Sequence, residues 1–350
     1  MRRAFLMGSC RALLGSLALA GLGTLACGRQ AEERPSQSSA LQVGLVFDIG
    51  GRGDKSFNDS AYRGLERAQR ELGADIHYHE PAEGADRETG LREYASRGYD
   101  LVIGVGFMFS DDIEKMAREF PNVKFACVDY TVKTGPEGEP LPLPANLVGL
   151  KFREEEGSFL AGATAALVSK TGIVGFVGGM DIPLIHKFEA GYRAGARHVL
   201  PHAEVLTAYA GVTASAFKDP AKGKELANSM FDRGADVIFH ASGTTGFGVF
   251  ESARERGKLA IGVDSDQWDE APGTVLTSMV KDVDVAVFGV IRDIQESRFQ
   301  GGLRELGLRD DGVRIVRDER NRDLLPDPVW ARVEALADSV AAGWIPVPRQ

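Results

Sequence analysis

From residue 41 onward the chain repeats one pattern: a short apolar run, a turn, and then apolar positions at helical spacing. Apolar runs that alternate with helical patterns are typical of parallel strands joined by crossover helices on both faces of a sheet. A Pro-, Gly- and Glu-rich segment at 134–146 interrupts the pattern. The sequence therefore predicts two α/β units joined near Leu147, with strands at 43–49, 75–79, 101–106, 124–129, 147–152, 172–178, 203–210, 236–242, 259–266 and 275–281.

The first helical pattern, at 57–72, has Leu65, Ala68 and Leu72 on one stripe, with charged side chains elsewhere. This distribution predicts a surface helix that packs on a sheet through one face. A similar argument applies at 329–343, where the apolar side chains have the spacing of a buried face. We therefore assign packing rather than chemistry to Trp330, Val333, Leu336 and Val340.

The helical pattern at 154–167 begins with three consecutive glutamates, Glu154, Glu155 and Glu156. Acidic side chains in the first turn of a helix are favoured by the helix dipole. A metal site is the alternative interpretation of such a cluster. We interpret the triplet as helix-start charge.

The N-terminal segment has the features of an export signal. Arginines precede a mostly apolar stretch at 12–26, which is too short to span a bilayer as a helix and ends in small residues. The segment TLAC, ending at Cys27, resembles a bacterial lipobox, whose cysteine is lipidated, with palmitate as an acyl group. We predict a signal peptide with lipobox at 1–27 and a flexible tether at 28–40. Thr24 departs from the commonest lipobox, so cleavage without lipid is the alternative.

Charge and cysteine content exclude some function classes. The formal charge of the chain is −9, and removal of the signal with Arg2, Arg3 and Arg11 takes it to −12. An acidic body without clustered Lys and Arg argues against a nucleic-acid partner. Loss of Cys10 and lipidation of Cys27 leave Cys127 alone, in an apolar run. We expect Cys127 to be a buried small hydrophobic residue rather than a nucleophile.

The segment VGLVFDIGGRGDKSFND carries the clearest candidate chemistry. An apolar strand ends at Asp48 in a Gly-rich turn, and Phe57 and Asn58 then open a helix. The carboxyl ends of strands in open α/β sheets are where ligands bind. An aromatic ring, an amide and a carboxylate suit a flat, uncharged molecule with hydroxyls better than a phosphate, which Asp48 and Asp54 would repel. An ordinary βα loop with capping residues is the alternative.

Other strand ends carry similar residues. The loops GFMFSDD, VDY, GGMDIP, HASGTTGFG and VDSDQW, with Lys281 nearby, are rich in Phe, Asp, Thr and Gly but poor in His and Cys. Such a set can stack on a ring and bind hydroxyls, but it contains no evident nucleophile and base. His77 and His79 share one side of a strand without a third metal ligand of suitable spacing, so we interpret them as surface histidines. No metal or other cofactor is expected.

Several motifs in the same order resemble the basic membrane protein family, the PnrA-like nucleoside-binding lipoproteins of bacterial transporters. They include VGLVFDIGGRGDKSFNDSAYRGL, GVGFMFSD, VGFVGGMDIPLIHKFEAGYRAG, IGVDSDQW and VLTSMVKDVD, between residues 43 and 284. The resemblance implies an α/β type I periplasmic-binding-protein fold, with two Rossmann-like lobes, parallel sheets and a hinge of three crossovers. It also implies closure over a purine nucleoside.

The resemblance further implies roles for individual residues. Phe57 would stack on the base, with Asn58 and Asp129 at the base edge and Asp48 in the same loop. Asp264 and Lys281 would hold the ribose hydroxyls, with Asp266 as the alternative to Asp264. The list of implied binding residues is completed by Gly246, beside the ribose, and by Phe239, or its neighbour His240, as the second ring. Thr244 stands where relatives commonly have glycine, which would narrow the pocket.

These observations lead to one functional hypothesis. The chain is expected to be a membrane-anchored lipoprotein that binds adenosine, guanosine or inosine and delivers them to an ABC permease and ATPase, without covalent chemistry. The N-terminal lobe is predicted to comprise 41–147 and about 275–310, and the C-terminal lobe 148–274 and about 311–350. A sugar or other small-solute receptor with a sensory role, and a nucleoside hydrolase, are the alternatives.

Overall fold

The computed structural model describes residues 40–81 and 87–350 of the chain. The predicted signal peptide, Cys27 and the tether as far as residue 39 lie outside the described residues. Within the described part, no helix combines the length and the apolar character needed to cross a membrane. The apolar runs and helical patterns of the sequence form two six-stranded sheets with helices on both faces.

The first sheet is entirely parallel, with the strand order β11-β5-β4-β3-β1-β2. Helices α1 and α8 cover one face, where Leu45 and Leu65 are fully buried. Helices α2 and α3 cover the other face, where Val46 is fully buried. Leu45 and Val46 point to opposite faces because side chains alternate along a strand. The elements are β1 (Gln42–Val46), α1 (Phe57–Leu72), β2 (Asp75–His79), α2 (Arg87–Ser96), β3 (Leu101–Val105), α3 (Ser110–Glu119), β4 (Lys124–Val128), β5 (Leu147–Phe152), α8 (Val283–Gln295) and β11 (Gly302–Leu306).

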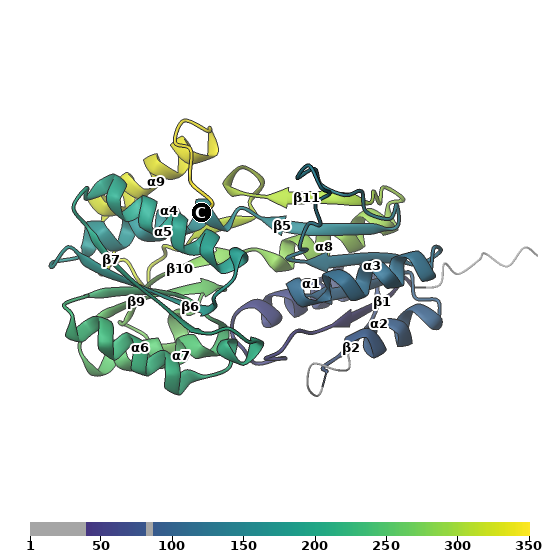
Figure 1. Ribbon diagram of the computed structural model, residues 1–350, viewed down its shortest axis with the longest axis horizontal. Coiled ribbons are helices and arrows are strands. Elements are labelled where there is room, and N and C mark those ends of the chain that lie inside the picture. The colour runs from purple at the N-terminus through teal and green to yellow at the C-terminus, as the bar shows by residue number, and fades with distance from the viewer. Residues whose placement is uncertain (1–39, 82–86) are drawn as a thin grey trace, which may run out of the picture. The chain divides into compact units, whose positions relative to one another are not determined.

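The second sheet has the order β12-β10-β9-β8-β6-β7 and is parallel except for β12, which runs antiparallel to β10. Figure 1 shows helices α4, α5 and α9 on one side of this sheet and α6 and α7 on the other. The elements are α4 (Glu154–Val168), β6 (Ile173–Met180), α5 (Pro183–Val199), β7 (Glu204–Gly211), α6 (Pro220–Asp232), β8 (Val237–Ala241), α7 (Gly246–Glu255), β9 (Leu259–Asp264), β10 (Val275–Lys281), β12 (Val313–Ile315) and α9 (Asp327–Ala341).

Two predicted helices have the expected buried faces. In α1, Leu65 and Ala68 are fully buried, and the helix ends at Gly73, whose left-handed backbone (φ 68°) lets its N–H close on the last turn. In α9, Val333 and Val340 lie in the core on the α4/α5 side of the second sheet. The packing role predicted for these apolar stripes is confirmed.

The chain crosses between the sheets three times: from β5 to α4, from β10 to α8, and from β11 to β12. Two predicted lobe boundaries differ from the sheet membership. Strand β5 (147–152) belongs to the first sheet and β10 (275–281) to the second. Each crossover follows its strand, at Arg153 and at Asp282, because the apolar run of the strand pairs with the neighbouring strands of its own sheet before the chain leaves.

The sequence pattern did not predict β11 and β12. Strand β11 lies at the edge of the first sheet, where half-buried and exposed positions alternate and Arg304 and Glu305 interrupt the apolar run. Strand β12 has three residues. Edge strands and very short strands carry a weak sequence signal because only part of their surface is buried.

Candidate ligand-binding site

A cavity lies where the carboxyl ends of the two sheets face each other. It contains about 660 Å³ of space not filled by protein atoms, counting the part that opens to solvent. The side chains and backbone that line it come from both sheets, and they include Asp48, Ile49, Asp54, Phe57, Asn58, Phe107, Asp129, Leu184, Ile185, Phe188, Phe217, Ser242, Thr244, Val263, Asp264 and Lys281.

The loop after β1 is held in shape by Asp54. Its carboxylate accepts hydrogen bonds from the backbone N–H groups of Ser56, Asn58 and Asp59 at 2.8–3.1 Å, at the start of α1. The Asn58 side chain also donates to Asp54 at 3.1 Å and accepts from the backbone N–H of Asp48 at 3.2 Å. Because these bonds fix the first turn of α1, Phe57 and Asn58 are oriented before any ligand binds.

Asp48 lies in the same loop and lines the cavity. Its carboxylate accepts a hydrogen bond from the N–H of Ile49 at 2.7 Å. Burial raises the pKa of Asp48 to about 7, with smaller contributions from the nearby charges of Asp129 and Asp54. Asp48 is therefore partly protonated at neutral pH, and in that state its carboxyl group can donate a hydrogen bond.

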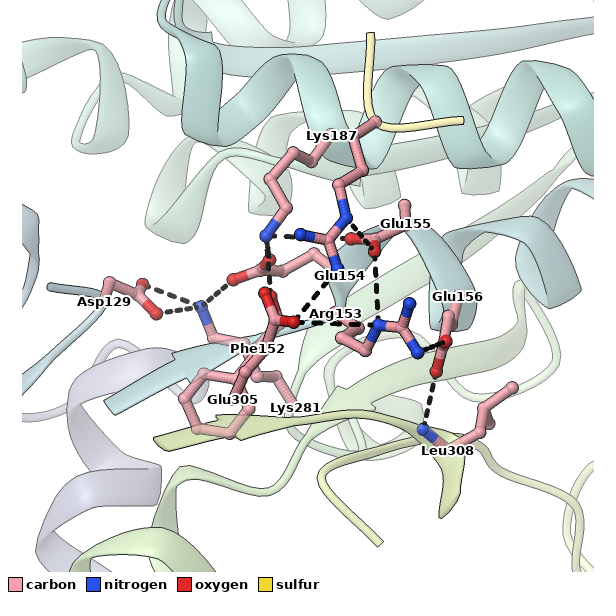
Figure 2. Close-up of polar contacts among 11 residues, drawn as sticks. Asp129, Phe152, Arg153, Glu154, Glu155, Glu156, Lys187, Lys281, Glu305 and Leu308 are labelled. Atoms are coloured by element: carbon pink, nitrogen blue, oxygen red, sulfur yellow. Dashed lines mark hydrogen bonds and ion pairs between the residues drawn. The ribbon is translucent and has the colours of Figure 1, made fainter. Parts of the chain in front are cut away.

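Lys281 and Asp129, which both line the cavity, form a buried ion pair, and Figure 2 shows their contact. The ammonium donates to both carboxylate oxygens, at 2.9 and 2.7 Å, and the Lys281 side chain is 2% exposed. Burial raises the pKa of Asp129, an effect that the charge of Lys281 opposes. The resemblance implies that Lys281 acts together with Asp264 on the ribose hydroxyls; both residues line the cavity, and the ion pair of Lys281 is with Asp129.

Asp264, at the carboxyl end of β9 in the second sheet, also has a buried carboxylate and lines the cavity. Its carboxylate accepts a hydrogen bond from the Ser56 hydroxyl at 2.9 Å, and burial raises its pKa to about 6. Asp266, the alternative to Asp264, pairs instead with Arg320 and does not line the cavity. Asp264 is thus the carboxylate of this loop that a ligand can reach.

Asp129 and Asp264 occupy corresponding positions in the two sheets, at the carboxyl ends of β4 and β9. Both have left-handed backbone, with φ of 59° and 62°. This conformation is uncommon for residues other than glycine, although aspartate tolerates it better than most. Backbone strain of this kind persists where the surroundings hold it, and it clusters at functional sites.

Four phenylalanine rings line the cavity: Phe57, Phe107, Phe188 and Phe217. Phe57 belongs to α1 and Phe188 to α5, two helices that pack on different sheets. Both rings are nevertheless close to the Lys281 ammonium, at 4.8 and 5.7 Å from ring centre to Nζ. Phe188 and Phe217 were not among the binding residues predicted from the sequence. Their signal is positional, because each follows the carboxyl end of a strand, β6 or β7.

The predicted second ring, Phe239, does not line the cavity, so this prediction is wrong. Phe239 is fully buried in the core on the α4/α5 side of the second sheet, where it packs against Phe176, Phe188 and Tyr192. The reason is that β8 is a central strand covered on both faces, and the alternation of side chains directs Phe239 toward the helices.

Two other residues predicted to bind the ligand, His240 and Gly246, also lie outside the cavity lining. His240 is fully buried, contacts Gln267 and Ser242, and has its pKa lowered to about 4 by burial. Gly246 opens α7 outside the cavity lining, where a Cβ atom would collide with the His240 ring. Gly246 is therefore needed for packing. Thr244 does line the cavity, as predicted, and its hydroxyl donates to the Phe217 carbonyl at 3.1 Å.

The remaining candidate side chains lie elsewhere. Cys127 lies in β4 and is fully buried on the α2/α3 face of the first sheet, as expected for a small hydrophobic residue, and burial raises the pKa of its thiol. His77 is paired with Asp75 on the edge strand β2. Among residues 40–81 and 87–350, no group of three or more His, Cys, Asp or Glu side chains is placed to hold a metal ion.

Loops from the two lobes contact each other beside the cavity. In addition to the bond between Ser56 and Asp264, the Ser265 hydroxyl donates to the Ser56 carbonyl at 2.7 Å. The Gln267 amide donates to the Lys55 carbonyl at 3.3 Å. The site therefore has contributions from both lobes and is bordered by direct hydrogen bonds between them.

Comparison with known proteins identifies a matching family, similar sequences and a similar solved structure. A family model described as "ABC transporter substrate-binding protein PnrA-like" matches residues 41–348. The chain is 37% identical to an uncharacterized lipoprotein of Pyrococcus horikoshii, over 79% of this chain and 69% of that protein. It is 36% identical to basic membrane protein A of Borreliella burgdorferi, over 81% of each. The crystal structure of an ABC transporter solute-binding protein from Aeropyrum pernix superimposes with a TM-score of 0.77 at 31% identity, covering 89% of this chain and 94% of that one.

Proposed function

This chain belongs to the PnrA-like family of ABC transporter substrate-binding proteins, as its motifs predict, and from that premise we propose that its substrate is a purine nucleoside. A substrate-binding component implies a permease and an ATPase as partners. The observation that carries the proposal is the combination of aromatic rings from both lobes and buried carboxylates in one cavity.

The rings support binding of a flat heterocycle. Phe57 from one lobe and Phe188 from the other present their rings to the same cavity, with Phe217 beside them. Stacking of a base on an aromatic ring contributes about 1–3 kcal/mol per base and tolerates different bases. In this proposal Phe57 stacks on the base, and Asn58 and Asp129 contact its polar edge.

The carboxylates support a ligand with hydroxyls and without a phosphate. Asp48, Asp54, Asp129 and Asp264 line the cavity, and Lys281 is the one cation among the described residues that line it. A phosphate would meet a net negative lining, whereas vicinal ribose hydroxyls can donate to Asp264. A deoxyribose would leave this buried acceptor without one of its donors, which lowers affinity.

Binding is proposed to work by hinge closure. The cavity surfaces come from both lobes, so a ligand that contacts both stabilises the closed arrangement over the open one. The cross-lobe bonds of Ser56, Ser265 and Gln267 would form in the closed arrangement. The closed protein would then present its bound nucleoside to the permease.

The location is part of the proposal. We propose that Cys27 carries a lipid anchor and that the protein faces the periplasm or exterior, in line with the name of the Pyrococcus relative. Mass spectrometry of the protein from membranes should find Cys27 acylated as the first residue. A mature N-terminus without lipid would support the alternative of simple cleavage.

The substrate assignment is tested by calorimetry on protein freed of endogenous ligand. Inosine, guanosine and adenosine should bind, whereas ribose, cytidine and inosine monophosphate should bind at least about tenfold more weakly. Binding of ribose or another sugar in place of the nucleosides would favour the small-solute receptor. The raised pKa values of Asp48 and Asp264 are also those of potential acid–base groups, so chromatography should accompany the titration. Release of hypoxanthine from inosine would identify a hydrolase.

A further inference from the structure

The three glutamates that begin α4 are buried at the hinge, although acidic side chains at a helix start are usually solvated. Glu154, Glu155 and Glu156 are 1%, 1% and 4% exposed. They directly follow Phe152 and Arg153, where the chain first crosses from one sheet to the other. Figure 2 shows all three carboxylates in ion pairs, with Lys187 shared by Glu154 and Glu155 and Arg153 shared by Glu155 and Glu156. The helix dipole alone does not explain three buried charges.

Two of the glutamates tie the hinge together. The Glu156 carboxylate accepts from the backbone N–H of Leu308, in the third crossover, at 2.9 Å. Glu155 pairs with Arg349 near the C-terminus at 2.8 Å, and Arg349 also pairs with Glu305 of β11 at 3.0 Å. These contacts join the first crossover to the third and to the C-terminal segment. None of these side chains lines the cavity.

Glu154 has a different set of partners. One of its carboxylate oxygens pairs with Lys187 of α5, and the other lies 3.6 Å from the Lys281 ammonium. Lys187 also donates to the Phe152 carbonyl at 2.6 Å. The result is a row of alternating charges, Lys187–Glu154–Lys281–Asp129, that runs from the hinge into the cavity (Figure 2).

The surroundings of the Lys281 ammonium limit its partners. The rings of Phe57, Phe152 and Phe188 lie 4.8, 5.2 and 5.7 Å from Nζ. Two of its three N–H groups donate to Asp129. At 3.6 Å Glu154 supplies charge without a normal hydrogen bond, which leaves the third N–H for a ligand.

We propose that Glu154, which does not line the cavity, is a positioning residue for substrate binding: it holds the Lys281 ammonium against Asp129 and links it to the first crossover. With Glu154 neutral, the ammonium groups of Lys281 and Lys187 would lose the carboxylate between them. Lys281 would then lose its fixed place in the cavity. Because the carboxylate is anchored at the hinge, the arrangement also couples the hinge to the cavity.

The electrostatics agree with this role. Burial opposes the charge of Lys281, but the carboxylates of Asp129, Glu154 and Asp264 together raise the pKa of its ammonium. Glu154→Gln keeps the shape of the side chain and removes its charge. Glu156→Gln is the matched control, since it makes the same change two residues away, at a buried carboxylate that does not contact Lys281.

The first measurement needs no ligand. In ¹H–¹⁵N spectra of the lysine ammonium groups, the buried Lys281 signal is identified by its loss in Lys281→Arg. Glu154→Gln should shift or broaden this signal, and Glu156→Gln should leave it in place. An unchanged Lys281 signal in folded Glu154→Gln protein would overturn the proposal. If Glu154→Gln does not fold, Glu154→Asp, which withdraws the charge by one methylene, should shift the signal, and an unchanged signal there is equally decisive.

The second measurement rests on the proposed function and uses inosine as the probe. Glu154→Gln should weaken inosine binding about tenfold, and Glu154→Asp should recover part of the loss. Glu156→Gln should stay within about twofold of the unchanged protein even if it melts earlier. Equal affinity losses in Glu154→Gln and Glu156→Gln would mean a merely structural role and would overturn the proposal. Absence of purine nucleoside binding by the unchanged protein would refute the proposed function instead, and the ammonium spectra would still decide the role of Glu154.

Discussion

Replacement of Lys281 by methionine should destabilise the protein strongly, because it removes the cation from a buried pair. The ammonium donates to both oxygens of Asp129 and lies 3.6 Å from Glu154. All three side chains are almost fully buried. Methionine has a similar length and fills most of the space, so the main change is the loss of charge rather than a cavity.

The expected loss follows from the geometry. Unit charges 2.7 Å apart attract by about 6 kcal/mol at an effective dielectric constant of about 20, and the cost of desolvating both ions offsets part of this attraction. Removal of one partner from a buried pair typically costs about 3–5 kcal/mol, since the other charge stays buried alone. We expect Lys281→Met to lower the free energy of unfolding by about that amount at pH 7.5.

The double variant separates charge from packing. Asp129→Asn alone should cost less than Lys281→Met, because Glu154 still faces the ammonium. Lys281→Met combined with Asp129→Asn should be more stable than Lys281→Met alone, since the unpaired Asp129 carboxylate is gone. Urea unfolding followed by circular dichroism gives the four free energies of this cycle.

The pH dependence of the stability loss in Lys281→Met provides a second test of this reasoning. Burial already raises the pKa of Asp129 above its ordinary value, and loss of Lys281 raises it further. Between the unfolded and folded pKa values the native state binds more protons than the unfolded state, so its stability falls as pH rises. The destabilisation by Lys281→Met should therefore be larger at pH 7.5 than at pH 5. A loss under about 1 kcal/mol at pH 7.5, or strict additivity in the double variant, would refute the reasoning.

Three further predictions concern affinity and accessibility. Phe57→Ala should raise the inosine dissociation constant about 5- to 150-fold in calorimetry, because the stacking contact is lost. Phe239→Leu should lower the melting temperature with little change in inosine affinity. The reverse pattern would restore Phe239 as the binding ring. Burial raises the pKa of Asp264 to about 6, and ribose hydroxyls would donate to its ionised form, so inosine affinity should fall about tenfold from pH 7 to pH 5. Asp264→Asn should lose most of this pH dependence. An inosine affinity that does not change with pH in the unchanged protein would contradict this prediction. In a variant without Cys10 and Cys27, the buried Cys127 should react with a thiol reagent only after unfolding, and rapid native labelling would show that it is accessible.

The sequence by itself determined the elements and the first half of the site. The alternation of apolar runs with helical spacing predicted the helices and all strands of the two sheets except the edge strands β11 and β12, because burial imposes these periods on a chain. Family resemblance predicted the fold, which the superposition on the Aeropyrum protein confirms. Asp48, Phe57 and Asn58 could be identified because one contiguous loop carries all three, and that loop ends a strand.

Only the tertiary structure decided which distant side chains meet. Phe239 and Phe188 are both apolar positions in the second lobe, and only the sheet order and the packing of α5 place Phe188 in the cavity and Phe239 in the core. Asp264 and Lys281 both line the cavity, and only the tertiary structure brings Asp129, at the end of a strand of the other sheet, into an ion pair with Lys281. The triplet at Glu154 looks like ordinary helix-start charge until three crossovers bring its partners around it. Local periodicity records how each segment is buried, whereas contacts between segments far apart in the chain depend on how the strands are ordered and how the chain crosses between sheets.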